Sequence, residues 1–233
     1  MKDSSDNNER VLKASRLFSS LEAGLIGQFA RTASRTRYAK GEYVWHTGTA
    51  ATHFAVIANG LVKISRSTAD GGETILALFG PRESVGDVAV LGARPYPADA
   101  IALTDVELLR IDATLVQGAF ASNPKLLASM NMSLIEHAQA LQEKIRIMSA
   151  GKIEKRLATL LLHLASRFGD EHDDGTTFVP IRISRTECAR LVGATMETTI
   201  RTFTRWQKTG LVATTPEGFS LHDVDALTEI TRA

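Results

Sequence analysis

The chain has 233 residues, 44% of them hydrophobic and 23% charged, which describes a globular protein with room for two modest cores and excludes a disordered or collagen-like chain. Lysine and arginine total 27 against 26 for aspartate and glutamate, so the net charge of +1 confines any nucleic-acid role to a local patch. The single cysteine, Cys188, excludes an internal disulfide and cannot by itself hold a structural zinc or an iron–sulfur cluster.

The first residues do not have the pattern expected of a signal peptide, which is a charged stretch followed by an apolar one. Residues 1–10 are polar and are interpreted as a frayed tail, whereas apolar residues at helical spacing within 11–35 predict one or two short helices. No apolar run reaches the roughly 18 residues that span a bilayer. We therefore expect a cytoplasmic protein without a membrane partner.

Residues 38–111 have the pattern of many short strands. Runs rich in β-branched and aromatic residues, such as 54–57 and 74–79, alternate with closely spaced glycines. Because no long helix separates these strands, their connections must be antiparallel. We predict a compact β-sandwich or barrel with flanking short helices, and we assign residues 1–121 to this first domain.

A long helix is predicted next, over residues 122–150, with a hinge at Ala150-Gly151. A helix of about 25 residues would be about 37 Å long, which exceeds the domain beside it, so we expect it to pair with a second copy in a parallel homodimer. The alternative is a helix that packs wholly on its own domain. The predicted dimer seam, with steps of three and four, consists of Leu127, Met130, Leu134, His137, Leu141, Lys144 and Met148.

Residues 151–233 predict a winged helix-turn-helix domain. After an amphipathic helix at 153–168 and a short strand at 179–183, Ser184 and Glu187 have the spacing of a capping box that starts a helix ending at Gly193. A second helix follows over 196–209, and residues 211–221 with a Pro-Glu-Gly turn predict a hairpin wing.

The helix-turn-helix also holds a local excess of positive charge. Residues 182–208 contain six basic and two acidic side chains. On the second helix Thr199, Phe203 and Trp206 form the inward face, which leaves Glu197 and Arg201 on the outward face. These two residues could form a simple surface ion pair, but the first turns of such a helix are those that meet base edges in a major groove.

The order of these segments resembles the Crp/Fnr superfamily of bacterial transcription regulators over nearly the whole chain. Residues 197–201 resemble the family's Glu-Thr-x-x-Arg pattern, and residues 60–64, 71–76 and 85–88 resemble its β-roll. The resemblance implies an α+β fold: an N-terminal antiparallel β-roll of the cyclic-nucleotide-binding jelly-roll type, a long dimerisation helix and a C-terminal winged helix-turn-helix. It also implies double-stranded DNA as partner, and RNA polymerase as a further partner if the protein is an activator; activation and repression stay open.

The resemblance implies roles for residues of the DNA-binding domain. Arg201 would donate to guanine, Glu197 would accept from cytosine, and the apolar Ile200 would meet a thymine methyl, with Met196 beside them. Met196 and Ile200 depart from the cyclic-AMP type, so we predict TTG-like half-sites nearer the Fnr type; Ile200 could instead pack on the first helix. The predicted phosphate contacts are Arg185, Thr186, Thr195, Thr198, Arg205 and Lys208.

The effector pocket departs further from cyclic-nucleotide members. Where those have a Glu and an Arg-Ser pair, this chain has Asp87 and Pro97-Ala98, which offer no cation and no hydroxyl to a cyclic phosphate. Leu141-Gln142 replaces the pair that would reach adenine. Together with Gly86 these residues form the predicted pocket. We expect no cyclic AMP in it, and either an unknown smaller or more apolar effector or none.

Several alternatives stay open. Haem held by one of the six histidines is one, a pH response of His137 is a second and a redox role of Cys188 is a third. A different function class would be a β-roll ligand-binding protein or a cupin-like metal protein without a DNA role, although His46 and His53 lack a third ligand. No metal site, catalytic constellation or enzyme activity is predicted.

Overall fold

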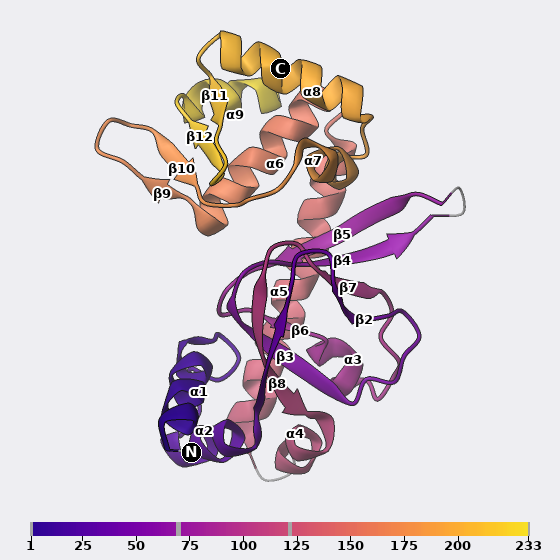
Figure 1. Ribbon diagram of the computed structural model, residues 1–233, viewed down its shortest axis with the longest axis vertical. Coiled ribbons are helices and arrows are strands. Elements are labelled where there is room, and N and C mark those ends of the chain that lie inside the picture. Colours follow the sequence, from indigo (N-terminus) through magenta and orange to yellow (C-terminus); the bar gives the residue numbers. More distant parts are fainter. Residues whose placement is uncertain (1, 69–70, 121–122, 233) are drawn as a thin grey trace. The chain divides into compact units, whose positions relative to one another are not determined.

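A computed structural model describes residues 2–68, 71–120 and 123–232 (Figure 1). The helices are α1 (Lys2–Ala14), α2 (Ala23–Thr32), α3 (Asp87–Leu91), α4 (Ala113–Phe120), α5 (Pro124–Ser149), α6 (Ile153–Phe168), α7 (Arg185–Val192), α8 (Met196–Lys208) and α9 (Val224–Arg232). The strands are β1 (Ser34–Tyr38), β2 (Tyr43–Trp45), β3 (His53–Asn59), β4 (Val62–Ser67), β5 (Glu73–Phe79), β6 (Ser84–Val85), β7 (Asp99–Ala102), β8 (Val106–Asp112), β9 (Asp170–Glu171), β10 (Thr177–Val179), β11 (Val212–Thr214) and β12 (Phe219–Leu221).

The chain divides into two compact units. The first takes in residues up to 67 together with 76–141, and the second takes in 68–75 together with the residues from 142 onward. The boundary that the sequence analysis put between residues 121 and 122 lies outside the described residues. The division into domains 1–121, 122–150 and 151–233 stays a prediction.

The first unit is the predicted β-roll. Two antiparallel four-stranded sheets, with strand orders β1-β8-β3-β6 and β2-β7-β4-β5, make up its body. Strand β8 pairs with both β1 and β3, so both of its edges are hydrogen-bonded within the first sheet. Apolar side chains of β3 fill the interior, where Phe54 and Ile57 are fully buried. The α+β class and the antiparallel roll are confirmed.

The prediction of a frayed tail is wrong for residues 2–10, which form most of α1. The reason is a buried amide: Asn8 is 4% exposed, its Nδ2 donates to the Ala30 carbonyl at 3.0 Å, and its Oδ1 accepts from Arg35 Nε at 2.7 Å. Leu12 from the same helix is fully buried in the cluster beneath α2. A polar sequence therefore packs here, because its amide finds partners on α2 and β1.

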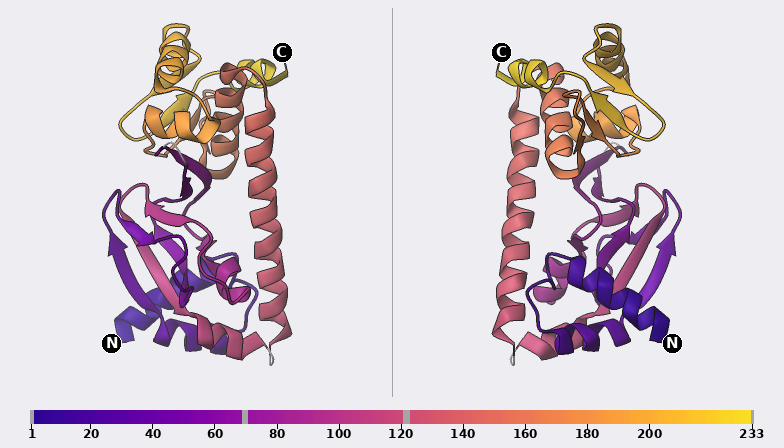
Figure 2. Two further views of the ribbon diagram at one scale, coloured as in Figure 1. Left: turned by 90° about the vertical axis from the view of Figure 1, so that its right-hand side faces the viewer. Right: turned by 90° about the vertical axis from the view of Figure 1, so that its left-hand side faces the viewer.

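The predicted long helix exists as α5, which Figure 2 shows as one continuous rod. It begins at Pro124, where a missing N–H costs nothing because the first helical turn has no acceptor for it. No helix among the described residues combines the length and apolarity needed to cross a membrane.

The second unit is a winged helix-turn-helix with a four-stranded sheet of order β11-β12-β10-β9. The wing is confirmed as the antiparallel pair β11 and β12. The strand predicted at 179–183 is misplaced, because β10 ends at Val179. Pro180 follows and has no N–H for the ladder, so the next residues leave the sheet in a turn in which the Ile181 N–H bonds the Val179 carbonyl.

Candidate nucleic-acid interface and sensor cavity

Helix α7 starts at the capping box that the sequence predicts. The Ser184 hydroxyl accepts the Glu187 N–H at 3.1 Å, and the Glu187 carboxylate accepts the Ser184 N–H at 2.6 Å. The helix ends at Gly193, whose φ of 64° lies in the left-handed region that favours glycine. The chain then enters α8 at once, so α7 and α8 form the predicted helix-turn-helix.

The last carbonyls of α7 are satisfied by cations from other helices, which the sequence analysis missed. Lys144 Nζ donates to the Leu191 carbonyl, and Arg156 Nη1 donates to the Val192 carbonyl at 3.2 Å. Such carbonyls lack partners inside their own helix, and positive charge is favourable there. Burial lowers the pKa of Lys144 to about 8. The signal in the sequence was a lysine within a mostly apolar seam.

Helix α8 buries the face that its periodicity predicts. Its N-cap Thr195 accepts the Thr198 N–H at 3.2 Å. The rings of Phe203 and Trp206 meet edge to face with 5.7 Å between their centroids, and Trp206 Nε1 donates to Glu154 of α6 at 3.2 Å. These contacts fix the rotation of α8 about its axis.

The opposite face of α8 is exposed. Met196 is 53% exposed and Ile200 40% exposed, and Glu197 and Arg201 are exposed beside them. The alternative in which Ile200 packs on the first helix does not fit this exposure. All four residues predicted to read bases therefore share one open surface over the first turns of the helix, and their role in reading bases stays a prediction.

The predicted phosphate-contacting residues fall into two groups. Thr186 on α7, Thr198 and Lys208 on α8 and the N-cap Thr195 are exposed or half-buried, and Thr186 Oγ1 contacts Met196 Sδ at 3.2 Å. The two arginines instead make contacts within the domain.

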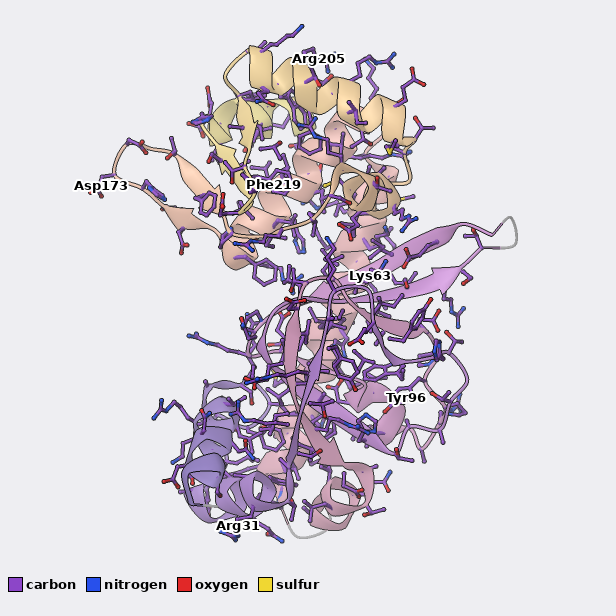
Figure 3. The ribbon with its side chains drawn as sticks, viewed as in Figure 1. Arg31, Lys63, Tyr96, Asp173, Arg205 and Phe219 are labelled. Atoms are coloured by element: carbon purple, nitrogen blue, oxygen red, sulfur yellow. The ribbon has the colours of Figure 1, made fainter. Side chains whose placement is uncertain are left out.

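Arg185 and Arg205 hold the domain together. Arg185 Nη1 donates to the Ile200 carbonyl at 3.4 Å and its Nη2 to Thr214 Oγ1 at 3.4 Å, while its guanidinium lies 5.1 Å from the centre of the Phe203 ring. Arg205, labelled in Figure 3, pairs with Glu154 at 2.5 Å. Each guanidinium therefore ties α8 to a neighbouring element, and any phosphate contact would have to share it.

Cys188 lies in the core of the helix-turn-helix. Its side chain is fully buried, and burial raises the pKa of the thiol to about 12. Because the thiolate is the reactive form, this environment fits a small core side chain better than a redox switch.

In the first unit a cavity of about 320 Å³ lies within the β-roll. Five of the six predicted pocket residues line it: Gly86, Asp87, Pro97, Ala98 and Leu141. Gln142 is not among the described residues that line it. Most of the remaining wall is apolar, with contributions from Trp45, Ile64, Leu76, Phe79, Val85 and Val88.

Two aromatic rings form one wall of the cavity. Trp45 and Tyr96 stack with their centroids 4.2 Å apart and their planes at 10°, and Figure 3 labels Tyr96 within the roll. Gly86 sits against them with a φ of 84°, and a Cβ there would lie 3.0 Å from Trp45 Cη2. Glycine is therefore required at this turn for both conformation and space.

Asp87 is one of two charged residues in the wall, with Arg66, and it is fully buried. Its Oδ2 accepts from Ser84 Oγ at 2.9 Å and from Ser133 Oγ of α5 at 2.5 Å. Its Oδ1 is buried without a hydrogen bond, 3.8 Å from His137 Nε2. Arg66, at another part of the wall, donates twice to the Pro97 carbonyl, at 2.9 and 2.7 Å.

The predicted dimer seam needs correction at four of its seven positions. Met130 is 1% exposed, and His137 faces Asp87 and the Phe79 ring, 5.2 Å away. Lys144 bonds α7, and Met148 lies against the turn at Gly193. These side chains point into their own chain. The residues that α5 exposes at steps of four and three, here called the exposed stripe, are Leu127, Asn131, Leu134, Ala138, Leu141 and Ile145.

Two family models match the chain. Residues 35–123 match a cyclic nucleotide-binding domain, and residues 155–230 match a Crp-like helix-turn-helix domain. Together the two ranges take in more than two thirds of the chain.

Similar proteins include transcription regulators from several bacteria. A CRP-like cAMP-activated global transcriptional regulator of Mycobacterium tuberculosis is 25% identical over 82% of this chain and 84% of its own length. The nitrogen fixation regulation protein FixK of Bradyrhizobium diazoefficiens is 26% identical over 91% of this chain and 88% of its own.

Solved structures agree on the fold. FixK2 from Bradyrhizobium japonicum superposes with a TM-score of 0.75 at 17% identity, over 85% of this chain and 97% of that one. A CooA mutant from Carboxydothermus hydrogenoformans superposes with a TM-score of 0.71 at 18% identity, over 96% of this chain and 99% of that one.

Proposed function

This chain belongs to the Crp/Fnr superfamily of bacterial transcription regulators, and from this we propose that two copies bind one palindromic DNA site, with one α8 in the major groove of each half-site. Its helix-turn-helix makes it a DNA-binding transcription regulator, and such a protein works where the bacterial chromosome is, in the cytoplasm. Regulators of this superfamily act by binding DNA and not by catalysing a reaction. RNA polymerase is a partner if the protein activates transcription.

The observation that carries the proposal is the exposed face of α8. Arg201 can donate two hydrogen bonds to guanine O6 and N7, and Glu197, one turn earlier, can accept from the N4 amino group of the paired cytosine. Ile200 presents a branched apolar surface that suits a thymine methyl group. We propose TTG-like half-sites on this basis.

Selection of binding sites from random duplex DNA tests the proposal. We expect palindromes whose half-sites share a G·C pair next to thymines, with half-site centres about 34 Å apart along the axis. Selected half-sites without a common G·C pair would contradict the assigned roles of Glu197 and Arg201.

The exposed stripe of α5 supports the homodimer. Leu134 is 38% exposed, Leu141 52% and Ile145 64%, and all three lie on one side of the helix. Steps of four and three are those of a two-stranded coiled coil, in which a second copy would cover these side chains. Pairing through this stripe would leave Lys144 and His137 facing their own chain.

We also propose that cyclic AMP does not act as the effector. A cyclic phosphate needs a bidentate cation and hydroxyl donors, but the cavity presents the Asp87 carboxylate and Pro97-Ala98 at the matching positions. Isothermal titration calorimetry of the full chain with cyclic AMP should give no saturable heat, and binding at micromolar concentration would contradict this.

The histidines give no particular support to haem or metal as cofactor. Among the described residues no group of three or more histidine, cysteine, aspartate or glutamate side chains could hold a metal ion. His53 contacts Arg110, and His137 faces Asp87, so both rings have structural neighbours. We propose that the protein works without a bound metal or haem, which absorption spectroscopy of the native protein would test.

A further inference from the structure

Glu154 of α6 bonds two consecutive side chains of α8. Its Oε1 accepts from Trp206 Nε1 at 3.2 Å and lies 2.5 Å from Arg205 Nη2. Trp206 is 2% exposed, so packing fixes its indole, and the indole in turn holds the carboxylate in place. Both helices belong to the second unit. Arg205 therefore has a negative charge fixed beside it.

Arg205, labelled in Figure 3, lies on the side of α8 that we propose to face DNA. Four exposed residues follow one another on this side at steps of four, four and three, namely Glu197, Arg201, Arg205 and Lys208. Arg205 is one turn, about 6 Å along the axis, beyond Arg201. Because the major groove is about 12 Å wide, a long side chain at this distance from the base-reading position reaches the phosphates that border the groove.

Glu154 and a DNA phosphate compete for the same guanidinium. The side chain of Arg205 is 56% exposed and that of Glu154 35%, and ion pairs with this much exposure are weak. A phosphate oxygen offers Arg205 a charge-assisted bond of the same kind. The carboxylate stays beside Arg205 through its bond to Trp206, so part of the positive charge remains neutralised when DNA binds. Binding then releases fewer counterions than it would with an unpaired arginine.

We propose that Glu154 weakens the contact between Arg205 and the DNA backbone and so limits the part of the DNA affinity that does not depend on sequence. Glu154 acts through Arg205 and is a positioning residue. The inference rests on the proposed function, because it takes α8 as the helix in the groove. It also has a definite sign: removal of this charge should strengthen DNA binding, whereas loss of a merely structural contact would weaken it.

Glu154→Gln in the full chain tests the proposal. The glutamine oxygen can still accept from Trp206 but carries no charge. In fluorescence anisotropy at low salt the variant should bind the selected palindrome at least about fivefold more tightly, and it should bind a random duplex more tightly by the same factor. The slope of log affinity against log salt should steepen by at least about 0.5 for each half-site, where a full phosphate contact gives about 0.9. Unchanged or weaker binding, or an unchanged slope, overturns the proposal.

Glu229→Gln is the matched control. Glu229 pairs with Arg232 on α9 at 2.6 Å, so this variant removes the same charge and releases an arginine outside α8. Its affinity and slope should equal those of the wild type. In an Arg205→Gln background Glu154→Gln should have no effect, because the guanidinium is gone. A gain that persists in that background, or an equal gain in Glu229→Gln, would trace the effect to general repulsion of DNA and overturn the proposal.

A second comparison decides if Glu154→Gln loses the fold. Among the residues that the structure describes, Lys208 has no ion-pair partner, so its full charge is available to a phosphate. Lys208→Ala should lower the salt slope by about 0.9 for each half-site. Arg205→Gln should lower it by less than half as much, because Arg205 is shared with Glu154. Equal reductions in the two variants overturn the proposal.

The wild-type protein separates this inference from the proposed function. If it binds the selected palindrome and Glu154→Gln brings no gain, the inference about Glu154 falls and the regulator stands. If no palindrome is selected with the wild type, the proposed function falls, and the inference falls with it.

Discussion

Arg201 and Lys208 both lie on the exposed side of α8, but their removal should have different effects. Arg201→Ala should lower the discrimination between the selected half-site and one with the G·C pair replaced by about 1–3 kcal/mol, because a bidentate contact to guanine is lost. Lys208→Ala should weaken binding to all sequences alike and lower the salt dependence, because a phosphate contact carries no base information. Fluorescence anisotropy with both DNA duplexes at several salt concentrations measures both quantities.

Equal loss of discrimination in the two variants would contradict these roles. Arg185→Ala is a less suitable phosphate control than Lys208→Ala, because Arg185 bonds the Ile200 carbonyl and Thr214 and stacks on Phe203. Its loss would shift α8 and change base reading and phosphate binding together.

We expect His53 to make the stability of the first unit depend on pH in the acidic range. Burial lowers the pKa of His53 to about 4, and Arg110, whose Nη2 lies 3.0 Å from His53 Nδ1, contributes to the same direction. In the unfolded chain the ring titrates near 6.5. The folded state therefore binds fewer protons than the unfolded state between these two pH values. The free energy of unfolding should fall as the pH drops from about 6.5 to about 4, and below about pH 4 this group should lower it no further.

Thermal unfolding as a function of pH tests this. His53→Gln keeps an acceptor for Arg110 but cannot be protonated, so its Tm should fall less than that of the wild type over this range. His46→Gln is the matched control, because the His46 side chain is 63% exposed. A wild-type and His53→Gln pair whose Tm values fall in parallel would show that His53 does not carry the response.

At the scale of the element, two turns of the β-roll require glycine for different reasons. One needs glycine only for its positive φ, and the other needs it also because a side chain would not fit. Gly48 and Gly60 have nearly the same φ, 82° and 83°, but a Cβ on Gly48 meets nothing within 4 Å, whereas one on Gly60 would lie 2.2 Å from the Asp105 carbonyl oxygen. Gly48→Ala should lower the free energy of unfolding by about 1–2 kcal/mol. Gly60→Ala should cost at least about 1–3 kcal/mol more, because the backbone must move. Denaturant unfolding of the two variants measures the difference, and equal costs would contradict it.

The helix-turn-helix could be predicted from sequence because its signals are local. The capping box at Ser184 and Glu187, the left-handed Gly193 and the inward spacing of Phe203 and Trp206 each depend on residues a few positions apart. Helix α1 could not be predicted, because the partners of Asn8 are more than twenty residues away.

The phase of the dimer seam could not be settled by periodicity. A stripe through positions 130, 137 and 144 and one through 131, 138 and 145 share Leu127, Leu134 and Leu141 and have the same alternating steps. The choice is made by tertiary contacts, namely His137 with Asp87 and Lys144 with the end of α7. Five of the six predicted pocket residues line the cavity. They could be identified because the resemblance to a known family indicated their positions, which spacing alone does not.

At the scale of the whole molecule, the exposed stripe of α5 should decide whether two half-sites are bound together. Replacing Leu134 and Ile145 by glutamate places charges on the proposed interface in both copies, where burial without a partner is costly. The double variant should be a monomer in analytical ultracentrifugation. It should keep its affinity for an isolated half-site and lose most of its affinity for the palindrome, because the two contacts are no longer linked.

Gln139→Glu is the matched control, since Gln139 is exposed on α5 but lies outside the stripe. It adds one negative charge per chain to the same helix, where the double variant adds two, and should leave a dimer with full affinity for the palindrome. A monomeric Gln139→Glu protein would mean that charge anywhere on α5 disrupts pairing, and a dimeric double variant would place the interface elsewhere. Because the half-site measurement depends only on α8 and the palindrome measurement on both copies, comparison of the two separates a lost interface from a damaged DNA-binding domain.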